Sequence, residues 1–236
     1  MSAAAPPVAA VFLNGEYTDP EFDRRVAARS DVLLAADGGA ARLAALGLRP
    51  DAVIGDMDSL AADVAAGLVA AGVPFVRHEV RKDQTDGELA VRYALAQGAG
   101  RILLAGALGT QLDHVLGHTA ILRRLAREGV EACALSAHLW ATVVRGPGEL
   151  QLAGTLGSRF SFVALTSCTS VTLRGFDYGL EGAEVGADTC LGLGNTVVSA
   201  TALVGLRSGE ALLLVFADGL AVEAVRRATP SGTPPP

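Results

Sequence analysis

The chain has 236 residues, of which 50% are hydrophobic and 19% are charged, and its formal net charge is −6. This length suffices for two domains with cores of their own, and the composition is that of an ordered globular protein. The negative charge, with no basic run to offset it, argues against a nucleic-acid partner, because a phosphate backbone would be repelled. A cation or a metal ion is the expected partner instead.

Targeting signals and cysteine pairs are not indicated. The longest apolar runs, such as 211–217, fall far short of the ~18 residues that span a bilayer, and residues 1–7 lack the pattern of a secretory signal. We therefore expect a cytoplasmic protein with no membrane partner. Cys133, Cys168 and Cys190 are far apart in the sequence, so we expect small buried hydrophobic residues rather than disulfides or a zinc site.

The first half of the chain has the pattern of a parallel sheet. From Val8 to Ser136, short aliphatic runs alternate with amphipathic stretches, which is typical of strands joined by crossover helices. The expected strands are Val8–Leu13, Val32–Ala36, Ala52–Ile54, Phe75–Arg77, Ile102–Ala105 and Ala132–Leu135.

Local signals place the ends of the helices. Asp19-Pro20 predicts an N-cap followed by proline in the first turn, and Thr85-Asp86-Gly87-Glu88 predicts a capping box that opens a helix to about Gln97. Glycines stand where C-terminal caps belong; they are Gly47, Gly72 and Gly98.

The second half of the chain changes to short alternating segments separated by glycine-rich turns, which predicts an all-β sandwich. The expected fold class is thus α/β: a Rossmann-like parallel-sheet domain over 1–137, a β-sandwich domain over 138–228, and a disordered Pro- and Ser-rich tail over 229–236. The expected strands of the second domain are Ala141–Val144, Ser161–Leu165, Val171–Leu173, Val197–Val204 and Leu212–Phe216.

Aspartates follow successive strands of the predicted parallel sheet. Ligands of open α/β sheets bind beyond the carboxyl ends of the strands, so these carboxylates should meet at one edge. Mutual repulsion makes such a group costly unless a cation neutralises it, and Mg²⁺, which keeps phosphate oxygens as further ligands, is the natural occupant. A polyphosphate substrate follows. The aspartates are Asp37, Asp56, Asp58, Asp83, Asp86 and Asp113.

Other residues near these aspartates have two readings each. Gly38-Gly39 would allow a phosphate to approach the backbone, but a glycine pair is also ordinary turn chemistry. Lys82, the only lysine among 19 basic residues, would contact phosphate or be a solvated surface charge.

Capping offers a structural alternative for several polar residues. Thr85 and Asp86 would stabilise a helix without any ligand, and Asp58 with Ser59 would cap a helix that begins near Leu60. His114 and His118 lie four apart on an expected helix and look like half a zinc site, but no third ligand is evident. For them we favour a structural or substrate-contacting role.

Four motifs in the same order and spacing resemble those of the thiamine pyrophosphokinase family. Together they cover most of the chain and are far more specific than any one of them. The motifs are Ala36-Asp37-Gly38-Gly39-Ala40, Pro50-Asp51 with Gly55-Asp56-Met57-Asp58-Ser59, Lys82-Asp83-Gln84-Thr85-Asp86-Gly87-Glu88, and Gly109-Thr110-Gln111-Leu112-Asp113-His114.

The resemblance implies transfer of the diphosphoryl group of Mg-ATP to the thiamine hydroxyl, giving thiamine diphosphate and AMP. It also implies that 1–137 is a nucleotide-binding catalytic domain, that 138–228 is a thiamine-binding domain, and that the protein is a homodimer with thiamine sites between subunits. The implied catalytic residues are Asp56, Asp58, Asp86 and Asp113, the first three also as Mg²⁺ ligands. The implied ATP-binding residues are Asp37, Gly38, Gly39, Lys82, Gln84 and Thr85, and the implied thiamine-binding residues are His114, Tyr178, Asn195 and Thr196.

An aromatic face attracts the positive thiazolium ring of thiamine, which supports Tyr178, although a core tyrosine at a strand edge is the alternative. Departures from the family pattern keep two other functions open: a diphosphokinase for another hydroxymethyl heterocycle such as a pterin, and a nucleotide-binding protein without catalysis. The departures are Ala41 for Asn, Thr110-Gln111 for Gly-Arg, Gly194 for Ser, and His118 for Asn. A glutamine in place of arginine loses a charged, bidentate phosphate contact.

Overall fold

A computed structural model of the chain describes residues 5–79, 83–216 and 225–227. The chain divides into two compact units. Unit 1 comprises Met1–Leu125 and Gly129–Ala137, and unit 2 comprises Ala126–Glu128 and His138–Pro236. Two predictions, the role of Lys82 and the disorder of the tail 229–236, lie outside the described residues.

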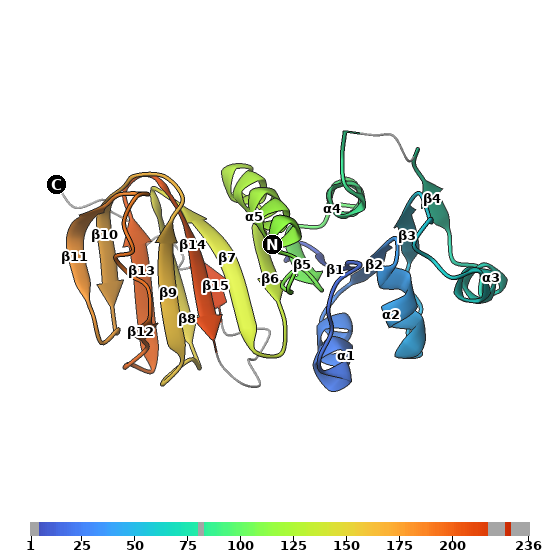
Figure 1. Ribbon diagram of the computed structural model, residues 1–236. Helices are drawn as coiled ribbons and strands as arrows, with labels where there is room; N and C mark the ends of the chain where they lie inside the picture. The colour runs from blue at the N-terminus through green and yellow to red at the C-terminus, as the bar shows by residue number, and fades with distance from the viewer. Residues whose placement is uncertain (1–4, 80–82, 217–224, 228–236) are drawn as a thin grey trace. The chain divides into compact units, whose positions relative to one another are not determined.

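Unit 1 contains a parallel sheet with the strand order β4-β3-β2-β1-β5-β6. Figure 1 shows α1 and α2 on one face of this sheet and α4 and α5 on the other. The strands are β1 (Val8–Phe12), β2 (Val32–Ala36), β3 (Ala52–Gly55), β4 (Phe75–Arg77), β5 (Arg101–Ala105) and β6 (Glu131–Leu135). The helices are α1 (Pro20–Ala28), α2 (Gly39–Ala45), α3 (Ala62–Ala70), α4 (Asp86–Ala96) and α5 (Leu112–Arg127).

The central strands of unit 1 are apolar along nearly their whole length because helices cover both faces of the sheet. Residues 9–12 of β1 and 102–105 of β5 are almost completely buried. The predicted helix signals are also confirmed. Asp19 caps α1 through its side chain, Thr85 and Glu88 form the capping box of α4, and the three predicted C-cap glycines have φ angles of 69°, 70° and 86°.

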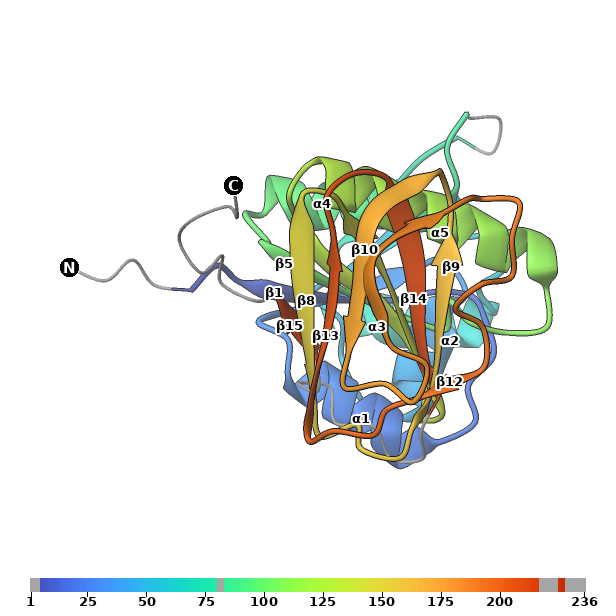
Figure 2. The same cartoon turned by 90° about the vertical axis from the view of Figure 1, so that its left-hand side faces the viewer.

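Unit 2 contains antiparallel strands in two groups. One group has the order β12-β9-β14-β7, and the other is a five-stranded sheet with the order β11-β10-β13-β8-β15. Figure 2 faces this unit and shows β8, β13 and β10 running alongside one another. The strands are β7 (Leu139–Arg145), β8 (Gly148–Ala153), β9 (Arg159–Ala164), β10 (Cys168–Arg174), β11 (Leu180–Val185), β12 (Asn195–Thr196), β13 (Thr201–Leu206), β14 (Glu210–Phe216) and β15 (Val225–Arg227).

Several sequence predictions need correction. The expected strand Val197–Val204 is wrong in its first half, because β13 begins only at Thr201. Helix α3 begins at Ala62 with Ala61 as its N-cap and no side-chain capping bond, so Asp58 and Ser59 do not cap it. Cys190 is exposed, whereas Cys133 and Cys168 are buried as predicted.

No helix in the described part of the chain combines the length and the apolar character needed to cross a membrane.

Candidate active site

The strand order of unit 1 contains a switch point between β1 and β5. From β1 the chain proceeds outward through β2, β3 and β4, and then returns to place β5 on the other side of β1. Loops leaving the carboxyl ends of two such strands diverge to opposite faces, which opens the crevice where ligands of α/β sheets bind. A pocket of about 330 Å³ lies there, lined by residues 14–16 after β1 and by residues of the 106–118 segment after β5.

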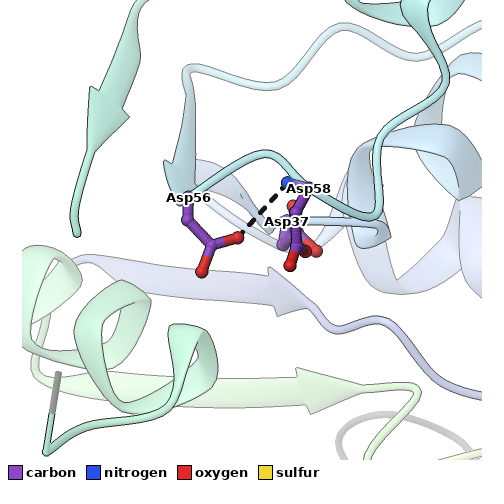
Figure 3. Close-up of side chains that lie close together, drawn as sticks. All are labelled: Asp37, Asp56 and Asp58. Carbon is purple, nitrogen blue, oxygen red and sulfur yellow. Dashed lines mark hydrogen bonds between the residues drawn. The ribbon is translucent and has the colours of Figure 1, made fainter. Parts of the chain in front are cut away.

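Three carboxylates lie close together beyond the ends of β2 and β3. One oxygen each of Asp37, Asp56 and Asp58 can be chosen so that all lie within 4.8 Å of one another. Figure 3 shows these side chains converging from the two strand ends, with the amide of Asp58 donating to Oδ1 of Asp56 at 3.2 Å. The predicted convergence of aspartates from successive strands is therefore seen for these three residues.

Asp37 is the most constrained member of this cluster. Its side chain is only 4% exposed, and its Oδ1 has no hydrogen-bond partner among the described residues. Its φ of 45°, unusual for a residue other than glycine, is held in part by its amide donating to the carbonyl of Ile54 at 2.9 Å. A buried carboxylate oxygen without a partner is costly, and such strain is concentrated at functional sites. The oxygen-only donor set fits Mg²⁺.

Asp86, the first residue of α4, borders the same cluster. A Cβ atom built on Gly55 would lie 2.9 Å from Oδ1 of Asp86 and 3.1 Å from Cβ of Asp37. The structure thus brings Asp86 beside Asp37. The predicted Mg²⁺ ligands are Asp56, Asp58 and Asp86, whereas the compact carboxylate group consists of Asp56, Asp58 and Asp37. Asp113, in the first turn of α5, is exposed and does not belong to this group.

The remaining residues predicted to bind ATP have structural roles in this site. Thr85 accepts from the amide of Glu88 at 3.2 Å as part of the capping box, and Gln84 accepts from Arg92 at 2.7 Å. A Cβ on Gly39 would lie 2.0 Å from the carbonyl oxygen of Phe12, so close packing on β1 already requires glycine there. Contacts of these residues with ATP stay predictions.

The pocket contains residues that sequence reasoning did not identify. Asn14 and Glu16 line it from the β1 end, and a Cβ on Gly38 would lie 2.5 Å from Cγ of Asn14. Asn14 therefore borders both the pocket and the turn that carries Asp37. The Asn-Gly pair directly after β1 was a visible signal, because residues after the first strand of an α/β sheet line the ligand crevice.

Two histidines line the pocket from α5. His114 and His118 have ring centroids 6.2 Å apart, and Nδ1 of His118 lies 2.8 Å from the carbonyl oxygen of Ala107. A carbonyl can only accept, so Nδ1 carries the proton. Burial lowers the pKa of His118, the Ala107 bond opposes this, and His114 adds to the lowering. A neutral His118 then has its lone pair on Nε2.

In unit 2 the predicted thiamine-binding residues are linked by one side chain. Asn195 is 1% exposed; its Oδ1 accepts from the amides of Tyr178 at 3.0 Å and Thr196 at 2.8 Å, and its Nδ2 donates to the carbonyl of Tyr178 at 2.7 Å. The Tyr178 side chain is 73% exposed. The alternative reading of Tyr178 as a core residue is therefore wrong, and Asn195 holds the segment that presents it.

An oxygen-rich carboxylate cluster beside a pocket at the switch point of a parallel sheet is typical of enzymes that act on metal-bound polyphosphates. Comparisons with known proteins find similarity to one family within this class. Residues 24–134 match the family model of the thiamin pyrophosphokinase catalytic domain. The thiamine pyrophosphokinase of Bacillus subtilis (strain 168) is 23% identical over 184 residues, which are 77% of this chain and 86% of that protein.

Solved structures of the same family share the fold. The thiamine pyrophosphokinase of Bacillus subtilis has a TM-score of 0.78 at 20% identity, over 89% of this chain and 99% of that one. The enzyme of Geobacillus thermodenitrificans has a TM-score of 0.77 at 24% identity, over 92% and 99%. That of Candida albicans has a TM-score of 0.77 at 13% identity, over 90% of each chain. The resemblance to the thiamine pyrophosphokinase family, first indicated by the four motifs, is thus confirmed.

Proposed function

We propose that this chain is a thiamine pyrophosphokinase, an ATP-dependent diphosphotransferase that converts thiamine and ATP into thiamine diphosphate and AMP. The observation that carries the proposal is the carboxylate cluster of Asp37, Asp56 and Asp58, in which a buried oxygen of Asp37 has no partner among the described residues. Three carboxylates at this spacing are compatible with the fold when a divalent cation neutralises them.

The cluster and its neighbour Asp86 would hold Mg²⁺ through their carboxylate oxygens. The ion, when bound, supplies positive charge that neutralises the ATP phosphates. Asn14 lines the pocket and also lies against Gly38, the residue after Asp37. The pocket is therefore next to the cluster, so one bound molecule can have its phosphates at the aspartates and its ring in the pocket. Lys82 is proposed as a further phosphate contact on the motif alone.

The reaction needs a nucleophile, a leaving group and a proton acceptor. The hydroxyl oxygen of thiamine attacks the β-phosphorus of ATP, the bond from that phosphorus to the α,β-bridging oxygen breaks, and AMP leaves with the bonding electrons. The hydroxyl proton passes to a carboxylate. The candidates are Asp86, which borders the cluster, and Asp113, which lies in the first turn of the pocket-lining helix α5. Phosphoryl transfer depends chiefly on such positioning and charge neutralisation.

Both substrates contain a 4-aminopyrimidine edge, in the adenine of ATP and in the pyrimidine of thiamine. A neutral set of pocket side chains that includes Asn14, Gln111 and His118 can donate to and accept from such an edge. We further propose that 1–137 is a Rossmann-like catalytic domain and 138–228 a thiamine-binding β-sandwich, that Tyr178 faces the thiazolium ring, and that the protein is a cytoplasmic homodimer.

The test is incubation of the purified protein with ATP, Mg²⁺ and thiamine, followed by chromatography for thiamine diphosphate and AMP. Equal amounts of both products are expected. Asp56→Asn and Asp58→Asn should abolish turnover with the fold retained, whereas Asp63→Asn, at an exposed residue of α3, should keep it. AMP formed only with another acceptor alcohol would change the substrate, and ATP binding without AMP release would refute catalysis.

A further inference from the structure

Glu16 and Thr110 connect the two loops that form the pocket, although they are 94 residues apart in the sequence. Oε1 of Glu16 accepts from the backbone amide of Thr110 at 3.0 Å and also from the Thr110 hydroxyl. Both residues line the pocket. One carboxylate oxygen therefore fixes both the backbone and the side chain of the residue that precedes Gln111.

The backbones of the two loops approach each other closely around this contact. A Cβ built on Gly109 would lie 3.2 Å from Cδ of Glu16, and a Cβ on Gly15 would lie 1.9 Å from the carbonyl oxygen of Gly106. Beneath the turn, the hydroxyl of Tyr17 lies 2.6 Å from the carbonyl oxygen of Leu13 and 3.2 Å from that of Ala105. Tyr17 thus links the carboxyl ends of β1 and β5, and Glu16 links the loops that follow these two strands.

We propose that Glu16 is a positioning residue, whose hydrogen bonds to Thr110 hold the 106–111 turn and so place Gln111 and His114 for the ring that occupies the pocket. This inference rests on the proposed function. Thr110 stands where the family resemblance leads to glycine, and a glycine has no hydroxyl to donate. The hydroxyl therefore adds a second bond in this chain, at the very turn where the arginine of the motif is replaced by Gln111.

Hydrogen bonding also stabilises the ionised form of Glu16. The pKa of Glu16 is lowered, first by the Thr110 hydroxyl and then by the Thr110 amide. Bonds from a hydroxyl or an amide to a charged acceptor are stronger than those between neutral groups. The contact is therefore charge-assisted at neutral pH.

Hydrogen exchange tests the contact without any ligand. In the wild-type protein the Thr110 amide should be protected, and Glu16→Ala should speed its exchange by roughly tenfold or more, since a solvent-facing amide without a partner exchanges freely. Glu21→Ala is the matched control, because Glu21 is an exposed glutamate on α1 whose ion pair with Arg24 is long, at 3.8 Å. Equal exchange in Glu16→Ala and Glu21→Ala would overturn the contact, whether or not the proposed function holds.

Steady-state kinetics test the positioning role with Mg²⁺, ATP and thiamine. Glu16→Ala should raise the KM of one substrate by roughly tenfold, with kcat and the other KM within about twofold; the substrate affected identifies which ring occupies the pocket. Glu16→Gln, which keeps an accepting oxygen, and Thr110→Val, which keeps the amide, should have smaller effects, and Thr110→Ser should behave as wild type. Thr110→Val should add little to Glu16→Ala, because both remove the same hydroxyl bond.

Other outcomes count against the positioning role. Unchanged KM values in Glu16→Ala, or a fall in kcat alone together with a lower melting temperature, would overturn it. If the wild-type protein has no turnover, the proposed function fails, and the affinity of wild type and Glu16→Ala for ATP then decides the role in the same way. Equal affinity, or no binding by either, would overturn it as well.

Discussion

Asp37→Asn separates two effects of the carboxylate cluster: charge repulsion that destabilises the metal-free fold, and binding of Mg²⁺ that stabilises it. Two unit charges 4.8 Å apart, the upper limit for the chosen oxygens of the cluster, repel by ~3.5 kcal/mol at an effective dielectric constant of 20. Solvent around the half-buried Asp56 and the exposed Asp58 reduces this to about 1 kcal/mol. Asparagine has the same shape and tolerates the positive φ of residue 37, so the backbone need not move.

Without metal, Asp37→Asn should therefore raise the melting temperature by about 2–4 °C. With Mg²⁺ at about 100 times its Kd, the wild-type protein should gain roughly 2.7 kcal/mol, or ~5–10 °C, and Asp37→Asn should lose most of this gain. Differential scanning fluorimetry with and without MgCl₂ measures both effects.

Asp63→Asn is the matched control, because it removes the same charge from an exposed first-turn position of α3. It should keep the full Mg²⁺ gain. An equal Mg²⁺-dependent rise in Asp37→Asn and the wild-type protein, or none in the wild-type protein, would refute the assignment of the cluster as the metal site.

Three further substitutions test the other parts of the site. Tyr178→Ala should raise the KM for thiamine by ~2–30-fold, whereas Tyr178→Phe keeps the aromatic face and should not; equal KM values in the two variants would contradict the cation–π contact. Because the folded-state pKa of His118 is lowered from 6.5, its neutral form stabilises the fold above pH 6.5, and this contribution is lost by up to ~1.4 kcal/mol per pH unit as the pH falls. Urea unfolding between pH 5 and 8 should show less pH dependence in His118→Asn and no change in the exposed control His78→Asn. Thr85→Ala should lower the free energy of unfolding by about 1 kcal/mol through loss of the capping box, and a melting temperature equal to that of wild type would contradict this role.

Much of unit 1 could be predicted from the sequence because its signals are local. Strands Val32–Ala36 and Phe75–Arg77 agree with the sequence prediction to the residue. Buried parallel strands must be apolar throughout, and helix termini need polar caps, so both leave marks within a few residues. Aspartates after successive strands could be expected to meet, because parallel strands end at the same edge.

The edge strand β11 of unit 2 escaped prediction for the opposite reason. Strand β11 lies at the end of its sheet, and most of its residues are exposed or half-buried. A strand with so little contact with the core does not need the apolar alternation by which strands are recognised.

The elements of unit 1, the caps and the set of candidate carboxylates can be predicted from the sequence, since each depends on neighbours within a few residues. Three features follow from the packing of the chain instead: Asp37 rather than Asp86 completes the compact group, Tyr178 is exposed, and Glu16 contacts Thr110. These contacts depend on strand order and on the path of loops between strands distant in sequence. No local pattern encodes which loops meet, because their approach is set by the packing of the whole sheet.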